Sequence, residues 1–301
     1  MFFLLCLFLT LQSGCDDQQK EKETRAEPAA PPFVIGLIPE QDLFSQKKRY
    51  EPLAAYLSKK AGVAIELKIL SRYGNIIDNF LAEKLDGAFF GSFTGALAIK
   101  KLGVIPVARP EWLDGTSTYY GMIFVRKDSG IKNVVDMKGK RFAWVDKATT
   151  AGWLFPLHFF HKQGIQDPQS SYLKESYFTG THEDAILDVL NGKADIGAAK
   201  NTVFYRLAET DKRVVDELEI LAESPLVPAN SLAFAPHVPS SLRNAVKKIL
   251  LGMSDDPDGR AILAEFGARR FIETTEHDYD PVFAYVEHVG IDLNSYDYSN
   301  N

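Results

Sequence analysis

The sequence predicts an α/β protein with two lobes, because two series of alternating strand and helix patterns follow one another along the chain. The first series runs from Phe33 to Ala108 and the second from Arg141 to Ala208. Between them, Tyr119 to Val125 is a strand pattern that no helical pattern follows. Ligands of open parallel sheets bind beyond the carboxyl ends of the strands, so we expect a ligand site in the turns after the strands, between the lobes.

In the first series, short apolar or alternating runs predict strands, and apolar residues three or four positions apart predict helices. The predicted strands are Phe33–Ile38, Val63–Ile69, Ala88–Phe90 and Val104–Ala108. The predicted helices lie around residues 50–57, 76–81 and 96–102. This alternation favours a parallel sheet.

The second series has the same pattern. The predicted strands are Arg141–Val145, Tyr172–Phe178 and Ala194–Ala199, followed later by Leu218–Ala222 and Ser231–Ala235. The predicted helices are Ala151–Gln163, Glu183–Asn191 and one beginning at Thr202. The remainder of the chain is predicted to be mostly helical. The predicted first lobe comprises residues 33–122 and 232–290, the second lobe residues 123–231, and a C-terminal tail residues 291–301.

Composition limits the kind of partner. The chain has 301 residues, 46% of them hydrophobic, which is ample for the cores of two lobes. The net charge is −6, and acids and bases are spread along the chain without a basic block, which argues against a nucleic-acid partner. A site for an anion must therefore be local, built from backbone amides and a few placed donors.

The N-terminus predicts export. The apolar run Met1 to Leu11 is shorter than the roughly 20 residues that span a bilayer, but it matches the apolar region of a secretory signal. Small residues precede Cys15, as in a bacterial lipobox, so residues 1–15 are predicted as a signal peptide with Cys15 as the lipid attachment site. The alternative is an uncleaved hydrophobic anchor. Residues 16–32 are polar, charged and end in prolines, which predicts a flexible tether.

The two cysteines of the chain, Cys6 and Cys15, both lie in this N-terminal region. The folded part therefore has no cysteine for a disulfide or for a thiolate metal site. We predict neither a metal nor a cofactor.

Two turns carry hydroxyls at predicted helix starts. Thr149 and Thr150 begin the helix that follows Arg141–Val145, where free backbone N–H groups and the positive end of the helix dipole favour an anion. Ser92 holds a similar position after Phe90. The alternative for both turns is ordinary helix capping.

Three further turns add candidate donors. His182 lies at a predicted helix start, where it can hydrogen-bond an anion or simply pack. Tyr73, with Arg72 beside it, follows the strand that ends at Ile69 and offers a hydroxyl. The segment Lys200 to Thr202, which contains Asn201, is a weaker candidate.

Six groups of residues occur in an order that resembles one known family. They are Arg49 to Leu53 with Tyr56 and Leu57; Asp86 to Gly91; Ser129 to Ile131 with Asp136 to Lys140; Thr149 to Gly152 with Pro156; Thr179 to His182; and Gly192 to Gly197. In this order, over about Phe33 to Ala284, the chain resembles the periplasmic phosphate/phosphite/phosphonate-binding family of ABC importers. The resemblance implies a two-lobed Venus-flytrap fold, the type II periplasmic-binding-protein fold, with two crossover strands.

The resemblance also implies a site for a phosphorus oxyanion. The hydroxyl-rich turn of the family falls on Thr149 and Thr150, with Ala151 in place of a common serine. The family histidine falls on His182, and two aromatic positions fall on Tyr73 and Phe90.

Members that take aminoalkylphosphonates hold the amine with acidic residues, and those positions fall near Val203 and Asn230. Neither residue is acidic, and an unpaired ammonium group is costly to desolvate. The resemblance therefore implies phosphite, phosphate or a small alkylphosphonate as ligand.

The predicted function is that of an extracytoplasmic solute-binding lipoprotein, a monomer in the periplasm or at the cell surface that docks on an ABC permease. The lobes are predicted to hinge near Tyr119 to Val125 and Asn230 to Ala235. Two alternatives remain open: a binding protein that signals to a partner such as a sensor kinase, and a flytrap for another organic ligand. An enzyme is disfavoured, because the chain lacks a nucleophile elbow, a Walker loop and a His-Glu-x-x-His motif. His158 and His161, three residues apart, are better explained by packing or surface placement than by a metal pair.

Overall fold

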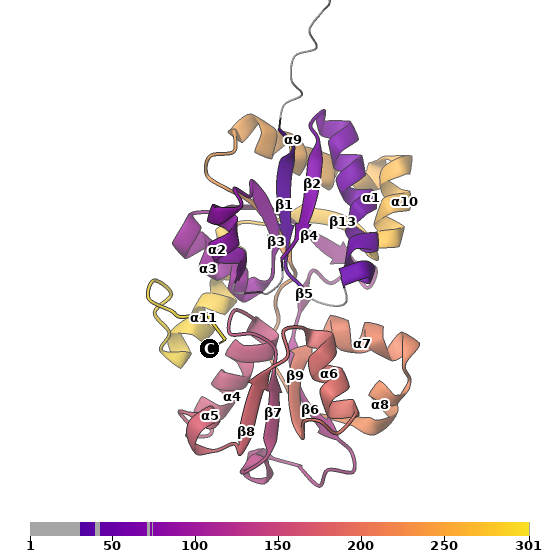
Figure 1. The fold of residues 1–301 in the computed structure, drawn as a ribbon. Helices are drawn as coiled ribbons and strands as arrows, with labels where there is room; N and C mark the ends of the chain where they lie inside the picture. The colour runs from indigo at the N-terminus through magenta and orange to yellow at the C-terminus, as the bar shows by residue number, and fades with distance from the viewer. Residues whose placement is uncertain (1–30, 40–42, 71–72, 74, 301) are drawn as a thin grey trace, which may run out of the picture. The chain divides into compact units, whose positions relative to one another are not determined.

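The computed structural model describes residues 31–39, 43–70, 73 and 75–300. They form two lobes, each built on its own sheet (Figure 1). The predicted signal peptide with Cys15, most of the predicted tether and Arg72 lie outside the described residues. None of the described helices is long and apolar enough to cross a membrane.

The sheet of the first lobe has six strands in the order β13-β4-β12-β3-β1-β2. Their bounds are β1 Phe33–Leu37, β2 Ile65–Ile69, β3 Gly87–Phe90, β4 Ile105–Trp112, β12 Ser231–Phe234 and β13 Ala268–Glu273. Strand β1 runs parallel to β2 and β3, whereas β12 is antiparallel to both β3 and β4. The four predicted strands of the first series, β1 to β4, thus run in the same direction, but β12 is inserted antiparallel between β3 and β4, so the sheet is mixed rather than parallel.

Strand β13 falls where the sequence predicted helix. It pairs antiparallel with β4 at the edge of the sheet. Only Ala268 and Phe271 of this strand are buried, and Arg269 and Arg270 lie exposed between them. A strand with this burial lacks the alternating apolar residues by which sequence reasoning finds strands.

Helices cover both faces of this sheet. They are α1 Leu43–Ala61, α2 Asn75–Ala82, α3 Ser92–Leu102, α9 Ser240–Leu251 and α10 Pro257–Phe266, with the short helix η3 at Met253–Asp255. Tyr50 on α1 joins the covering layer to the core, since its ring lies 5.1 Å from the rings of Phe89 and Phe266, edge to face. Helix α3 is buried through its first eight residues, which fixes its N-terminus against the end of β3.

The sheet of the second lobe has five strands in the order β10-β6-β9-β7-β8. Their bounds are β6 Gly121–Arg126, β7 Arg141–Trp144, β8 Glu175–Phe178, β9 Ile196–Lys200 and β10 Leu218–Glu223. The helices are η1 Val134–Met137, η2 Thr150–Leu154, α4 Phe155–Lys162, α5 Pro168–Ser171, α6 His182–Leu190, α7 Asn201–Thr210 and α8 Arg213–Glu217. Strand β7 is parallel to β8 and β9, whereas β6 is antiparallel to β9 and β10. The predicted helix Ala151–Gln163 is divided into a π-helical turn, η2, and α4.

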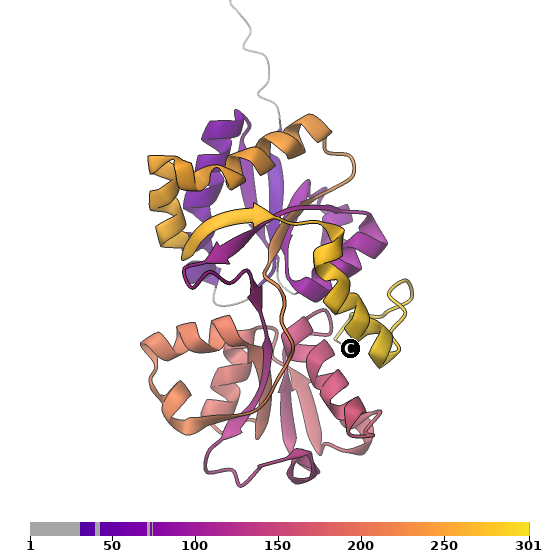
Figure 2. The same ribbon diagram turned by 180° about the vertical axis from the view of Figure 1, so that it is seen from behind.

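Two segments cross between the lobes side by side (Figure 2). Strands β5 (Thr118–Tyr119) and β11 (Val227–Pro228) pair antiparallel at the crossing. Of the predicted hinge segment Tyr119–Val125, only Tyr119 belongs to the crossing, because Gly121–Val125 lie in β6 of the second sheet, and Asn230 to Ala235 leads directly into β12 of the first sheet.

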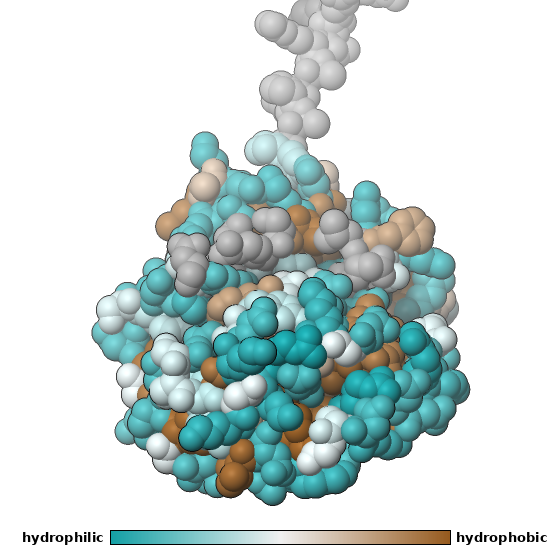
Figure 3. All heavy atoms as spheres, turned by 60° about the horizontal axis from the view of Figure 1, so that its bottom comes forward, coloured by the Kyte–Doolittle hydropathy of each residue, from teal (hydrophilic) through white to brown (hydrophobic). Residues whose placement is uncertain are grey.

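The chain ends against both lobes. After η4 (Glu276–Tyr279), helix α11 (Asp280–Val289) contacts α3 of the first lobe and η2 and α4 of the second (Figure 1). The face in Figure 3 is mainly hydrophilic, with scattered hydrophobic side chains, as is ordinary for a protein surface.

Candidate ligand-binding site

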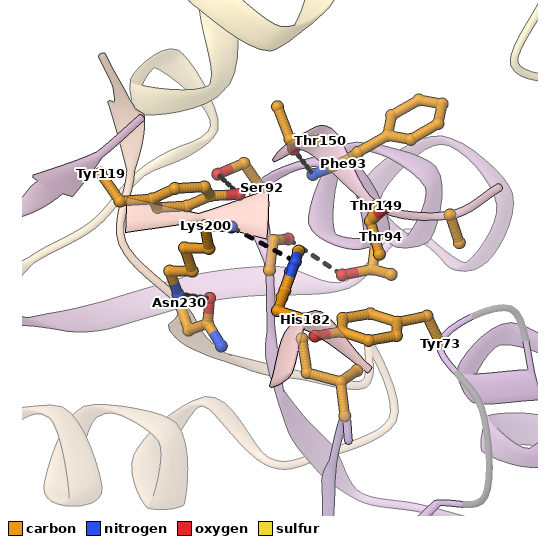
Figure 4. A pocket seen from close by; sticks show the side chains of 13 residues that line it. Tyr73, Ser92, Phe93, Thr94, Tyr119, Thr149, Thr150, His182, Lys200 and Asn230 are labelled. Carbon is orange, nitrogen blue, oxygen red and sulfur yellow. Dashed lines mark hydrogen bonds between the residues drawn. The ribbon is translucent and has the colours of Figure 1, made fainter. Parts of the chain in front are cut away.

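A small cavity of about 10 Å³ lies where the turns of both lobes meet (Figure 4). Its lining combines three helix starts with residues from the crossing segments and from the end of β9. The polar lining residues are Tyr73, Ser92, Thr94, Tyr119, Thr149, Thr150, His182, Lys200 and Asn230. The cavity therefore has the position that the strand-to-helix turns predicted.

The turn after β7 forms the wall in the second lobe. Thr149, the residue before η2, donates from its amide (2.9 Å) and its hydroxyl (2.7 Å) to the backbone carbonyl of Asp146. The Asp146 carboxylate accepts from the amide of Ala148 at 2.8 Å, which closes the turn on itself. Gly152 lets η2 approach β7, because a Cβ there would lie 2.4 Å from the Cβ of Val145. The two threonines are thereby fixed at the start of a helix, where backbone amides point outward.

The start of α3 forms the wall in the first lobe. Ser92 and Thr94 are almost fully buried, and Gly91 caps the helix without a side-chain bond. The Ser92 hydroxyl donates to the carbonyl of Pro228 at 2.7 Å and lies 3.0 Å from the Tyr119 hydroxyl. The amide of Phe93 donates to the Thr150 hydroxyl at 2.9 Å. This bond joins the two walls directly, so the lobes are closed on one another.

His182 is the first residue of α6 and points into the cavity (Figure 4). Its Nδ1 accepts a hydrogen bond from the amide of Lys200 at 3.3 Å. A neutral imidazole whose Nδ1 accepts carries its hydrogen on Nε2, so Nε2 is the ring's donor. The ring of Tyr73 meets the histidine ring edge to face at 5.8 Å and helps to fix its orientation.

Lys200 brings a cation to the cavity. Its side chain is only 3% exposed, and its Nζ lies 4.3 Å from the centre of the Tyr119 ring and donates to Asn230 Oδ1 at 3.0 Å. Among the described residues that line the cavity, none is acidic. A lining rich in hydroxyls, helix-start amides and cationic or imidazole N–H groups is suited to an oxyanion, since hydrogen bonds to a charged acceptor are the strong ones.

Six of the nine predicted site residues line this cavity: Tyr73, Ser92, Thr149, Thr150, His182 and Asn230. The other three have different surroundings. Phe90 packs in the core with its ring 6.0 Å from that of Phe80, and Asn201 Oδ1 accepts from the amide of Tyr120 at 3.1 Å. Ala151 packs against Gly121 of β6.

Sequence reasoning assigned no site role to Tyr119 and Thr94, and it left Lys200 as a weak candidate beside Asn201. Strand β9 ends at Lys200, and its last residue rather than the next one turns toward the cavity. A cationic residue closing a strand was the available signal, but the direction of its side chain depends on the strand's register. Tyr119 comes from a crossing strand, which the turn-based search did not cover.

Within the described part of the chain, no group of three or more His, Cys, Asp or Glu residues is arranged to hold a metal ion. His158 packs against the rings of Tyr285 (4.7 Å) and His288 (4.4 Å), and His161 Nε2 lies 3.0 Å from the carbonyl of Gln166. His158 thus packs among aromatic rings, whereas His161 makes a polar contact with the backbone.

Two lobes joined by crossing strands, with a donor-lined cavity between them, define a two-lobed periplasmic binding protein. The chain belongs to the family described as "ABC transporter, phosphonate, periplasmic substrate-binding protein", whose family model matches residues 35–279. It is thus the substrate-binding component of an ABC transporter rather than a member of an enzyme family, as the ordered segments implied.

Relatives support the same assignment. The chain is 24% identical to the phosphonates-binding periplasmic protein of Escherichia coli (strain K12) over 82% of this chain and 74% of the relative. It is 28% identical to the phosphate-import protein PhnD of Mycolicibacterium smegmatis over 69% of this chain and 65% of the relative. The structure of PhnD1 from Prochlorococcus marinus in complex with methylphosphonate superimposes with a TM-score of 0.76 at 21% identity, covering 86% of this chain and 98% of that one.

Proposed function

We propose that this protein captures a small phosphorus oxyanion, namely phosphite, phosphate or a small alkylphosphonate, between its lobes and presents it to an ABC permease. The observation that carries the proposal is the meeting of three helix starts from two lobes, those of α3, η2 and α6, at one cavity without a described acidic residue. The ligands named for the relatives, phosphonates, phosphate and methylphosphonate, share a tetrahedral oxyanion that such a site suits.

In the proposed complex, the ligand oxygens accept from the Thr150 hydroxyl, from helix-start amides and from His182 Nε2, and also from Thr149 once its hydroxyl turns from the Asp146 carbonyl to the ligand. Hydrogen bonds to a charged group contribute roughly 1.5–3 kcal/mol each, so a few suffice for the about −8 kcal/mol of micromolar affinity. The amide of Phe93 already donates to Thr150 across the two walls. A ligand oxygen placed between them replaces this direct contact with two contacts of its own.

The size and charge of the cavity favour small ligands without an amine. Its volume of about 10 Å³ corresponds to about one water molecule, so even a tetrahedral anion requires the walls to separate slightly. At the side of Asn230, the lining presents the ammonium group of Lys200. An aminoalkylphosphonate would bring a second ammonium group to this region, where like charges repel.

The proposal extends to attachment and movement. Cys15 is the proposed lipid attachment site, residues 16–32 the tether, and β5 with β11 the hinge between the two lobes. The predicted lobe boundaries shift slightly, because Gly121 and Met122 belong to β6 of the second lobe and Ser231 to β12 of the first. The support is the pattern of small residues before Cys15 and the pairing of β5 with β11 where the chain crosses. Labelling with a lipid precursor in wild type but not in Cys15→Ser tests the anchor, and light scattering of purified protein tests the proposed monomer.

A thermal-shift and calorimetry panel tests the ligand. The probes are phosphite, phosphate, methylphosphonate, 2-aminoethylphosphonate and sulfate. A ligand at a hundred times its dissociation constant adds about 2.7 kcal/mol to the free energy of unfolding. We expect a shift with at least one of the first three probes and a weaker one with 2-aminoethylphosphonate.

Two variants locate the site. Thr150→Ala and His182→Ala should abolish the shift while each remains folded. Thr210→Ala and His277→Ala are the matched controls, since both residues are exposed and neither lines the cavity. If both site variants keep the affinity of the controls, the proposed site is wrong.

A further inference from the structure

The chain's last described residues, 291–300, lie beyond the family match, which ends at residue 279. They pack behind the wall of the second lobe. The Tyr296 hydroxyl donates to the carbonyl of Lys147 at 2.8 Å. Asn300 makes two bonds: its Oδ1 accepts from the amide of Lys147 at 3.0 Å, and its Nδ2 donates to the Asp146 carboxylate at 2.8 Å. These residues therefore hold the turn that leads into Thr149 and Thr150.

The same segment also reaches the first lobe. The ring of Tyr296 lies 5.6 Å from that of Phe93, at the start of α3. The Tyr298 hydroxyl donates to Asp78 of α2 at 2.7 Å. Lys101 of α3 donates to the carbonyl of Asn294 at 2.9 Å. Residues 291–300 thus form a bridge that touches both walls of the cavity from outside.

The contact with Asp146 matters because that carboxylate is fully buried. Its Oδ1 accepts from the amide of Ala148, and its backbone carbonyl accepts from both the amide and the hydroxyl of Thr149. A buried charge is tolerated where hydrogen bonds satisfy it, and Asn300 supplies the bond to Oδ2. A change at Asn300 therefore reaches Thr149 through a single residue.

We propose that Tyr296 and Asn300 are positioning residues of the binding site, and that residues 291–300 hold the Asp146–Thr150 turn against α3 in the closed form. The bridge slows opening and hence ligand release. The expected effect of the bridge on ligand affinity rests on the proposed function, whereas its expected effect on the closure of the lobes does not.

Binding kinetics test the first part. Tyr296→Phe keeps the ring contact with Phe93 and removes the hydroxyl that is bonded to Lys147, and Asn300→Ala removes the bonds to Asp146 and to the Lys147 amide. With phosphite and methylphosphonate as probes, we expect the dissociation constant to rise about 5- to 20-fold, the lower part of the range for coupled sites, mostly through faster dissociation. The matched control is Tyr172→Phe, which loses a bond of the same kind, to the carbonyl of Val134 at 2.8 Å, within the second lobe.

A pH profile separates positioning from general packing. Asn300→Asp sets a second carboxylate against Asp146, and two adjacent carboxylates cannot both ionise without strong repulsion. At pH 8 the variant should therefore bind more weakly than wild type. Toward about pH 5 one of the pair holds a proton, and the ratio of the two dissociation constants should fall toward one. A ratio that does not change with pH contradicts the proposed link through Asp146.

Amide exchange tests closure without any ligand. The amide of Phe93 is bonded to Thr150 only when the walls meet, so its exchange rate reports the closed fraction. In Tyr296→Phe and Asn300→Ala we expect faster exchange at Phe93, with melting temperatures near that of Tyr172→Phe. If wild type binds no phosphorus oxyanion but exchange accelerates, the proposed function fails and the bridge stands. If exchange and ligand dissociation both match those of the control, the bridge is refuted.

Discussion

The cavity has one wall in each lobe, and each wall is the start of a helix: α3 in the first lobe and η2 in the second. Different parts of the chain pack behind these two helix starts. Behind α3, Tyr279 fills the space beside Gly95, where a Cβ would lie 2.4 Å from the ring, and its hydroxyl is bonded to Ser231 of β12. Behind η2, Gly152 packs closely against Val145, which directly follows β7, and the Asp146 carboxylate accepts a hydrogen bond from Asn300 near the end of the chain. Both walls touch residues 291–300, but the first also rests on Tyr279 and β12 of its own lobe, whereas the buried Asp146 carboxylate behind the second is bonded to Asn300.

The comparison is tested most strongly by adding one methyl group to each wall. In Gly152→Ala the new Cβ meets the Cβ of Val145 at 2.4 Å and Thr149 Oγ1 at 2.9 Å. Because Val145 is fully buried directly after β7 and cannot move far, we expect a loss of about 3 kcal/mol in stability and loss of oxyanion binding. Gly95→Ala should cost a similar stability, about 2–3 kcal/mol, but should retain more of the binding, since Thr149 is untouched.

Urea unfolding and calorimetry on the same samples give both quantities. Gly252→Ala is the control, because its added Cβ approaches nothing closer than 3.3 Å. Equal loss of binding in the two wall variants would mean that the walls do not differ as described.

The second test removes one hydroxyl from each wall. Thr150→Val removes a hydroxyl that donates to the ligand in the proposed complex, and a hydrogen bond to a charged group contributes roughly 1.5–3 kcal/mol. We therefore expect a dissociation constant at least about tenfold higher. Thr94→Val loses a bond within its own turn, to the carbonyl of Gly91, and should change affinity much less. Isothermal titration with phosphite or methylphosphonate measures both, and the reverse order of effects would contradict the interpretation.

Some of this site follows from the sequence and some does not. Thr149, Thr150, Ser92 and His182 were found because a helix start after a strand is visible as a change in apolar spacing. Phe90 came from the family resemblance and Asn201 from the turn after β9, and in each case a neighbouring residue, Gly91 or Lys200, lines the cavity instead. In a strand, successive side chains point to opposite faces, so an error of one position reverses the direction.

The support behind the walls was not predictable in the same way. The contact of Asn300 with Asp146 joins residues 154 positions apart, and no local pattern marks it. Strand β13 was missed because its exposed residues are charged. The antiparallel pairing of β12 arises from the return of the chain across the hinge, which is a property of topology rather than of any segment.

A smaller effect is expected from the hydroxyl behind the first wall. Burial raises the pKa of Tyr279 to about 12, so this side chain stays neutral over the physiological range. Tyr279→Phe removes the bond to Ser231 and keeps the ring beside Gly95, which should cost about 1 kcal/mol of stability. Affinity should stay within about twofold of wild type, because the ring rather than the hydroxyl sets α3. A large loss of affinity would show that the first wall, too, depends on a remote polar contact.

The smallest expected effect is a pH dependence of stability that arises where α4 packs against α11, the helix that leads to the bridge. Burial lowers the pKa of His158, helped by the nearby positive charges of His288, Lys162 and His161. The unfolded chain therefore takes up this proton more readily than the folded one, so stability falls as the pH drops below about 6.5, the ordinary value for histidine. His158→Phe keeps the ring contact with Tyr285. Between pH 7 and 5 the melting temperature of this variant should fall less steeply than that of wild type, by an amount that corresponds to the uptake of less than one proton on unfolding. The change His161→Gln, at a half-buried histidine, should leave most of the slope in place. If the melting temperature of His158→Phe instead depends on pH as steeply as that of wild type, the contact of α11 with α4 does not respond to pH. The support that this contact gives to the bridge is then the same at all physiological pH values.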